Sequence, residues 1–244
     1  MHAFGQILKI ETRLFLRDFG SPLTTVVLPL ALLLVFGLIP AMREPDPQYG
    51  DVSFVQYFAP SLLVITLAMS AVNILPTVLA TYRERGVLRR LATTPASPAA
   101  LLAAQLVISL ATILVSAVLL IAVGRLAFDV PLPRRPLGFT LALILGTAAL
   151  LALGLLVAAV ARTTKSAQGL AVPLFMAVMF FGGVYVPRFL LPDFLVQIGD
   201  YTPPGVQALL DAWTGTSPHP LHLGIMAAVA VAAGAIAAKL FRWE

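Results

Sequence analysis

Cysteine is missing from this chain, and charge is scarce. None of the 244 residues is cysteine, which excludes disulfides, a thiolate nucleophile and cysteine-ligated metal sites. Only 11% are Asp, Glu, Lys or Arg, whereas 59% are hydrophobic; globular chains average about 45–50% apolar residues. Folded as a soluble protein, this chain would have too few polar side chains to cover its surface. It is therefore predicted to be an integral membrane protein.

The few charges divide the sequence into long uncharged runs. Each run has room for one helix of about 20 residues, the length that crosses roughly 30 Å of hydrocarbon. The runs without Asp, Glu, Lys or Arg cover residues 19–42, 52–82, 91–124, 136–161, 166–187 and 212–238. We expect an all-α fold, one transmembrane domain over residues 1–244, with spans near 23–41, 57–79, 99–123, 137–160, 169–185 and 221–238.

The distribution of basic residues predicts the orientation. Six spans place both termini on one side, and the segments on that side carry eleven of the sixteen Lys and Arg residues. Because cytoplasmic segments are enriched in Lys and Arg, both termini are expected in the cytoplasm of a multi-pass protein of the cell membrane. The basic isoelectric point, near 10.0, thus reports topology, and no nucleic-acid partner is expected.

The N-terminal segment, residues 1–22, has the pattern of an amphipathic helix. Lys9, Glu11, Arg13 and Arg17 lie toward one face, and apolar residues recur at helical spacing at Phe4, Ile7, Leu8, Leu14, Phe15 and Phe19. This pattern is typical of a helix lying in the membrane interface, in contact with the lipid bilayer. The alternative is a helix packed on a partner protein.

An arginine-dense segment, residues 81–94, separates the second and third spans. Four arginines fall within eight residues, at positions 83, 85, 89 and 90. On a helix, Glu84, Val87, Leu88 and Leu91 would share one arc. Thr81 and Glu84 match a capping box, and Thr94–Pro95 and Ser97–Pro98 would end this helix and start the next. We expect a cytoplasmic docking helix; ordinary basic flanking of a span is the alternative.

Between the fifth and sixth spans, residues 186–213 are apolar but interrupted by Pro187, Pro192, Pro203 and Pro204. The apolar pieces form helical stripes of only two to three turns, too short to span. A solvated loop would not carry this much Leu and Phe. Two short re-entrant helices, buried against protein in the outer leaflet, are predicted.

Catalytic motifs are missing from the sequence: it has no phosphate-binding loop, no H-E-x-x-H and no G-x-S-x-G. His219 and His222 have no third ligand nearby, so no metal site is expected. No charged residue lies deep in a predicted span, which argues against coupling to an ion gradient. Asn73, Gln105 and Ser109 are polar exceptions that serve either interhelical hydrogen bonding or substrate contact.

The fifth span is rich in Phe and Met. Phe175, Met179 and Phe180 are among these residues, and soft adaptable side chains suit a surface that meets varied apolar substrates. Core packing is the equally open alternative. Together with Asn73 of the second span, these three residues are the candidate lining of a transport pathway.

Three motifs occur in an order typical of one family. LRDFGSPLTTVVLPLALLLVFG covers the first span. The stretch from Glu84 to Ser97 is similar to E-R-x-x-G-x-[LT]-x-x-L-x-x-[TS]-P-x-S, with one residue missing between Arg85 and Gly86. The stretch from Gly182 to Pro203 is similar to G-G-x-x-x-P…L-P-x-[FW]-L…P. Within the six-span frame, they make the chain resemble, over its full length, the permease subunits of the ABC type-2 transporter family.

The resemblance implies a half-transporter without catalytic residues or cofactors of its own. Two copies, or one copy and a paralogue, would pair as a homo- or heterodimer, and each would dock a separate ATPase subunit that binds ATP and Mg²⁺. The implied docking residues are Glu84, Arg85, Gly86, Leu88, Arg89 and Leu91. The implied outer gate contains Pro187, Pro192, Phe194 and Pro203.

Substrates in this family vary widely. The short outer loops and the Met- and Phe-rich fifth span favour export of amphipathic drug-like compounds, as in multidrug efflux, or of lipidic ones. Lipid-linked glycans are the alternative. A polytopic membrane enzyme or assembly factor is the rival from another class, although such an enzyme should show paired acidic or histidine residues at a membrane face, and none are found.

Overall fold

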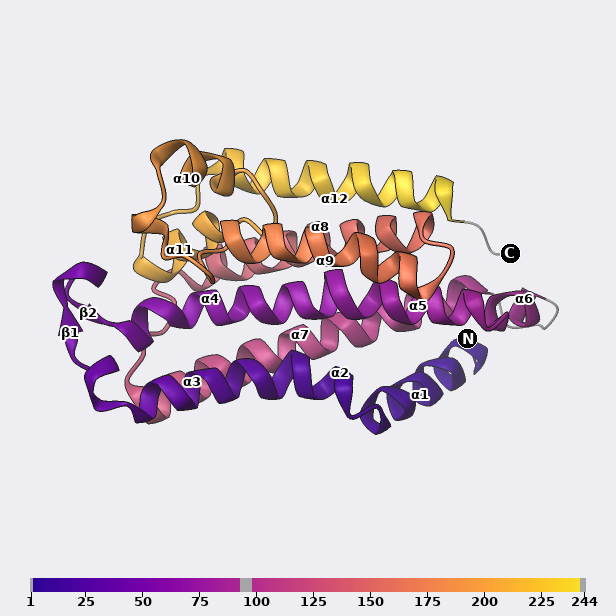
Figure 1. Cartoon of the computed structure of the whole chain (residues 1–244), viewed down its shortest axis with the longest axis horizontal. Helices are drawn as coiled ribbons and strands as arrows, with labels where there is room; N and C mark the ends of the chain where they lie inside the picture. The colour runs from indigo at the N-terminus through magenta and orange to yellow at the C-terminus, as the bar shows by residue number, and fades with distance from the viewer. Residues whose placement is uncertain (1, 93–97, 242–244) are drawn as a thin grey trace.

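The computed structural model of this protein describes residues 2–92 and 98–241. Over these residues, six helices are long and apolar enough to cross a membrane. They run side by side along the longest axis of the molecule, with α1 and the end of α12 at the same end (Figure 1). The six spans are Gly20–Leu38, Phe54–Glu84, Ala99–Phe128, Pro136–Val160, Thr164–Phe181 and Pro220–Leu240. The predicted all-α membrane fold is confirmed.

The span boundaries differ from the predicted ones by a few residues. Helix α1, His2–Arg17, ends before residue 22, and Gly20–Pro22 already forms the first turn of span one. Span two continues to Glu84, five residues beyond the predicted end at 79. The later spans are made by α7 (Pro98–Phe128), α8 (Pro136–Val160), α9 (Thr164–Phe181) and α12 (Pro220–Leu240).

Spans one and two each contain a widened π-helical turn just before a proline. Span one consists of α2 (Gly20–Pro22), η1 (Leu23–Val27) and α3 (Leu28–Leu38), and span two of α4 (Phe54–Ala68), η4 (Met69–Ile74) and α5 (Leu75–Glu84). Proline has no N–H and displaces the carbonyl four residues earlier, so the helix must locally rearrange. Before Pro29 this carbonyl belongs to Thr25, and the buried hydroxyl of Ser116 donates to it at 3.2 Å.

Span two is the central helix of the domain. Most of its residues are buried, and those of α4 form the largest share of the hydrophobic core. Span four approaches it closely: a Cβ built on Gly154 would lie 1.9 Å from the carbonyl oxygen of Ala71. Only glycine allows the two backbones to come this near. A movement of span two must therefore involve its neighbours.

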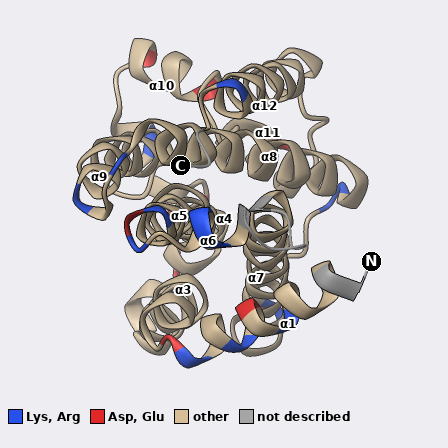
Figure 2. Ribbon diagram, turned by 90° about the vertical axis from the view of Figure 1, so that its right-hand side faces the viewer, with Lys and Arg blue, Asp and Glu red and all other residues tan. Residues whose placement is uncertain are grey.

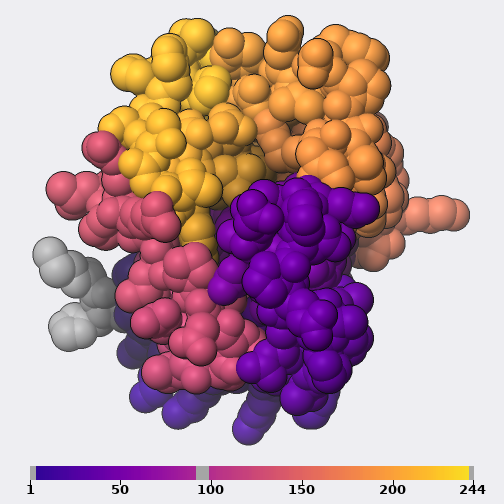
Figure 3. All heavy atoms as spheres, turned by 90° about the vertical axis from the view of Figure 1, so that its left-hand side faces the viewer, coloured from indigo at the N-terminus to yellow at the C-terminus, as the bar shows by residue number. Residues whose placement is uncertain are grey.

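The opposite end of the molecule from α1 carries the connecting segments (Figure 3). They are η2 (Pro40–Met42), β1 (Pro45–Asp46), η3 (Pro47–Tyr49), β2 (Val52–Ser53), η5 (Arg188–Leu190), α10 (Asp193–Asp200) and α11 (Val206–Thr214). Strands β1 and β2 pair antiparallel, so the first connection contains a short two-stranded ribbon. The ring of Phe189 lies 5.9 Å from Tyr49 and 5.8 Å from Tyr57, which joins this ribbon to the segment after span five.

Arg134 and Arg135, in the connection between spans three and four, contact the end of α11. The backbone N–H groups of Arg134 and Arg135 donate to the carbonyls of Trp213 and Ala212, at 3.2 and 3.0 Å. The Arg135 Nε donates to the carbonyl of Gly215 at 2.8 Å. These groups satisfy the carbonyls at the C-terminal end of α11, where a cation is also favoured by the helix dipole.

Candidate functional site

A short helix, α6 (Val87–Ala92), follows span two at the end of the molecule where α1 and the end of α12 lie. The chain changes direction at Gly86, whose φ of +69° is readily adopted only by glycine. Basic residues gather around this end (Figure 2). The predicted docking helix of residues 81–94 is thus divided: residues 81–84 belong to span two, and residues 93–97 lie outside the described part of the chain.

The two faces of α6 differ from the expected arrangement. Leu88, predicted to contact a partner, is only 2% exposed and packs in the protein's own core. Leu91 packs against the same core. Arg85 and Arg89 are exposed. The surface that α6 presents outward is therefore basic, and its leucines hold the helix onto the transmembrane domain.

Three consecutive residues at the end of span two contact different elements. The hydroxyl of Tyr82 donates to a carboxylate oxygen of Glu11 in α1, at 2.7 Å. The Nη1 of Arg83 donates to the carbonyls of Ala158 and Ala161 at the end of span four, at 2.7 and 2.5 Å.

The third residue, Glu84, accepts hydrogen bonds at the start of span five. They come from the backbone N–H of Thr164 at 2.9 Å and from its hydroxyl at 2.7 Å. We call Tyr82, Arg83 and Glu84 the anchor triplet. Two residues, Arg85 and Gly86, separate it from Val87, the first residue of α6.

The anchor triplet also replaces an interaction predicted from the sequence. Thr81 and Glu84 do not form a capping box, because both lie in the last turns of α5. Thr81 donates instead to the carbonyl of Thr77 at 2.8 Å, and its hydroxyl lies 3.2 Å from that of Thr164. Glu84 does act as a cap, but for a helix 80 residues further along the chain.

A polar cleft of about 490 Å³ opens between the start of span one and the second half of span two. Its wall on span two is one helical stripe of partly exposed residues. The residues lining the cleft are Asp18, Ser21, Asn73, Ile74, Thr77, Val78, Thr81, Tyr82 and Arg85. Asn73, a candidate pathway residue, thus lines a cavity, and two charged residues, Asp18 and Arg85, line it as well.

The three pathway candidates on span five have other surroundings. Phe175 and Met179 are 8% and 2% exposed and belong to the core, so they present almost no surface to a second subunit or a substrate. Phe180 is partly buried, with its ring 5.4 Å from that of Phe181. The exposed side of span five carries Val172 and Met176, 46% and 47% exposed.

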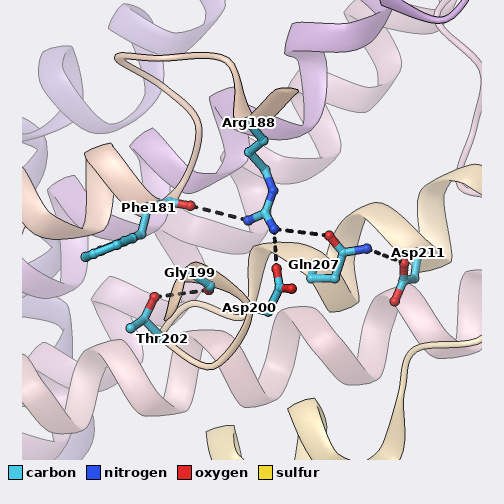
Figure 4. Close-up of polar contacts among 7 residues, drawn as sticks. All are labelled: Phe181, Arg188, Gly199, Asp200, Thr202, Gln207 and Asp211. Atoms are coloured by element: carbon cyan, nitrogen blue, oxygen red, sulfur yellow. Dashed lines mark hydrogen bonds and ion pairs between the residues drawn. The ribbon is translucent and has the colours of Figure 1, made fainter. Parts of the chain in front are cut away.

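The broken segment after span five contains two short helices, α10 and α11, as predicted. The predicted burial holds for α11 and not for α10, whose Phe194 and Ile198 are 62% and 46% exposed. Arg188 is the centre of its polar contacts (Figure 4). Its guanidinium forms an ion pair with Asp200 and donates to the amide oxygen of Gln207 at 3.3 Å and to the carbonyl of Phe181 at 3.4 Å. Gln207 in turn donates to Asp211 at 2.7 Å. Arg188 thereby ties the end of span five to both α10 and α11.

The predicted gate residues lie around this network. Pro187 precedes η5, and Pro192 precedes the first residue of α10. Phe194 is 62% exposed, and Pro203 lies between α10 and α11. Whether they form a gate stays a prediction.

Arg188 and Glu11 were not identified as site residues from the sequence. Arg188 is a single charged residue among apolar ones, whereas Glu11 lies between Lys9 and Arg13 and gives no such signal in the sequence. The two histidines near span six, His219 and His222, have rings 5.6 Å apart, and no group of three potential metal ligands occurs among the described residues. Gln105 and Ser109 are both buried, and Gln105 makes a hydrogen bond between helices.

Six spans, a basic helix joined to span two and a broken helical segment before span six together define a multi-pass membrane permease. The sequence model of the family described as ABC-2 type transporter matches residues 2–204, so the chain belongs to that family as a membrane subunit. Searches of curated proteins and of solved structures give no match.

Proposed function

We propose that this protein is the permease subunit of an ATP-driven exporter and that a separate ATPase docks on α6. The family supports a transport subunit with an ATPase partner in a membrane. The observation that carries the proposal is the anchor triplet, because it links the segment next to α6 to α1, span four and span five. Force applied to α6 would reach these elements through hydrogen bonds and packed backbones.

The docking surface is proposed to be the basic side of α6. Arg85 and Arg89 are exposed, whereas Leu88 is buried in the core. A partner surface must therefore supply carboxylates, which pair well with guanidinium groups. In this arrangement both termini are cytoplasmic, and ATP and Mg²⁺ bind to the partner.

The cleft between spans one and two is proposed as the place where substrate enters. Polar groups at membrane depth, such as Asn73 and Thr77, are unfavourable against lipid and favour a face covered by protein or water. The cleft combines two charged residues, Asp18 and Arg85, with the apolar Ile74 and Val78. This suits an amphipathic drug-like or lipidic compound, and a second copy or a paralogue would close the pathway from the opposite side.

Charge reversal on α6 tests the docking proposal. The tagged permease, purified from its native membranes in mild detergent, should carry a Mg²⁺-dependent, vanadate-sensitive ATPase activity and an ATPase subunit identified by mass spectrometry. The variant Arg85→Glu/Arg89→Glu should lose both while inserting normally. Arg43→Glu, at the other end of the molecule, is the matched control and should keep them. If the double variant retains the ATPase, docking on the basic side of α6 is refuted.

Substrate entry is tested with the same preparation. Substitution of Asn73 by Leu should change which members of a panel of fluorescent amphiphiles, ethidium among them, stimulate ATP hydrolysis. Thr12→Ala, on the exposed side of α1, should leave the panel unchanged. An unaltered profile in a well-folded Asn73→Leu protein would exclude the cleft from the pathway.

A further inference from the structure

Glu11 occupies an unexpected position on α1. The side of this helix that packs against the spans is formed by Ile7, Leu8, Glu11 and Phe15, at the spacing of one helical stripe. Glu11 is only 8% exposed, while the neighbouring Ile10 and Leu14 are 56% and 50% exposed. A carboxyl group thus lies where an apolar residue would be expected. Burial of such a group is costly unless it is hydrogen-bonded.

Two hydrogen bonds satisfy this carboxyl group, and both come from spans. Its Oε2 accepts from the hydroxyl of Tyr82 at 2.7 Å and from the Nε2 of Gln105 at 2.5 Å. Tyr82 belongs to the last turn of span two, and Gln105 to the beginning of span three. The connection that contains α6 runs between these two positions. Glu11 therefore joins the helix entering this connection to the helix leaving it.

We propose that Glu11 is a positioning residue, which fixes α1 to the ends of spans two and three so that α1 moves together with α6. The inference rests on the proposed function, since α6 is there the docking site of the ATPase. Apolar contacts of Ile7 and Phe15 can hold a helix against its neighbours at several similar offsets. A buried polar group with directional partners selects one offset, as buried polar residues do in helix pairs.

If α1 were held only by apolar packing, replacing Glu11 and its two partners by apolar residues would leave its position unchanged. If Glu11 positions α1, the same replacement would change it. Replacing Glu11 alone by Ala leaves the Tyr82 hydroxyl and the Gln105 amide without an acceptor, which destabilises the protein in either case. Replacing all three, as Glu11→Leu/Tyr82→Phe/Gln105→Leu, removes every unsatisfied group and keeps the volume. The triple variant should therefore fold with near wild-type thermal stability while losing the directional contacts.

The test uses spin labels on α1 and span three of the full chain in lipid nanodiscs. Ile10 and Val107 are suitable sites because they are 56% and 43% exposed, and the chain has no native cysteine. We expect a single narrow distance distribution in the parent protein and a broad or shifted one in the triple variant. The single variant Glu11→Gln, which keeps an acceptor oxygen, should give the same narrow distribution as the parent protein. Thr12→Ala, whose hydroxyl bonds only to Leu8 of its own helix, is the control.

A second readout uses the complex with its ATPase. The triple variant should keep the bound ATPase and hydrolyse ATP, but transport should fall several-fold per ATP consumed. An unchanged narrow distribution in the folded triple variant would overturn the inference, whether or not an ATPase binds. Failure of any ATPase to bind the parent protein would overturn the proposed function instead, and the distance distributions would still decide the position of α1.

Discussion

The carboxylate of Glu84 accepts two hydrogen bonds from Thr164, one from the backbone N–H at 2.9 Å and one from the hydroxyl at 2.7 Å. A side chain at the end of span two thereby satisfies an N–H at the start of span five. The first turn of a helix has free N–H groups and favours negative charge, so the contact is well placed in both respects. It connects a residue close to α6 to the helix that leads into the broken segment of α10 and α11.

Cysteines at Thr81 and Thr164 should form a disulfide. The two hydroxyl oxygens lie 3.2 Å apart, and the chain contains no other cysteine. In the double-cysteine protein, oxidation should link spans two and five and stop ATP-dependent transport, and reduction should restore it. Addition of Glu84→Ala should slow disulfide formation several-fold, because the contact that holds the two ends together is lost. Equal rates with and without Glu84 would show that the carboxylate does not align these spans.

Gly86→Ala should destabilise the turn into α6 by about 1 kcal/mol, because its φ of +69° is unfavourable for an L-residue. A Cβ there would meet nothing within 4 Å, so the cost is conformational and not steric. Gly224 also has open space around a built Cβ but lies inside α12, where Ala is favourable. Thermal unfolding should therefore distinguish a destabilised Gly86→Ala from an unharmed Gly224→Ala. Equal midpoints would contradict this account of the turn.

The contribution of Glu11 to stability should depend on pH. Burial raises the pKa of this carboxyl above its ordinary value of 4.5, and the hydrogen bonds from Tyr82 and Gln105 only partly offset the increase. The folded protein then holds the proton at pH values at which the unfolded chain has released it. The stabilisation is fully present below the unfolded pKa and is lost as pH rises through the folded one.

Glu11→Gln provides the comparison, since an amide does not titrate. As pH rises from about 4.5, the thermal midpoint of the parent should fall relative to that of the variant. The difference should become constant above the raised pKa of Glu11. Other titrating groups are common to both proteins and cancel. A difference that stays constant across this range would mean that the pKa of Glu11 is the same in the folded and unfolded states.

Two ion pairs among the described residues, Arg188–Asp200 and Arg125–Asp129, should differ in strength. The side chains of Arg188 and Asp200 are 11% and 20% exposed, whereas those of Arg125 and Asp129 are 51% and 92% exposed. Arg188→Leu should cost on the order of 3 kcal/mol, because Asp200 is left buried without its partner. Arg125→Leu should cost less than about 1 kcal/mol. A double-mutant cycle with Asp200→Leu should recover part of the loss; simple additivity would show that the pair does not act as a unit.

Topology can be tested with single cysteines and a membrane-impermeant thiol reagent. Sites at Asp46, Leu132 and Gln197 should react in intact cells, and sites at Arg89 and Ser166 should react only after permeabilisation. The expectation follows from the basic residues gathered at the end that carries α6 (Figure 2). Reaction of the Arg89 site in intact cells would place α6 outside and remove the ATPase docking proposal.

The sequence by itself determined the architecture. Each uncharged run is long enough for one span. It must form a helix, because a backbone in hydrocarbon has to satisfy its own hydrogen bonds. The prolines of residues 186–213 likewise predicted α10 and α11, and the glycine at position 86 marks the turn before α6. These features depend on residues close together in the chain.

Only the tertiary structure decided which faces meet. An arc containing Leu88 looked like a partner surface, but the same leucine satisfies the core when α6 folds back onto the spans, so the exposed side is the basic one. Phe175 and Met179 are buried for the same reason: apolar side chains suit a core, lipid or a substrate equally well. The partners of Glu11, Glu84 and Arg188 are also decided by the fold, since buried polar groups must find hydrogen-bond partners wherever the packed helices bring them.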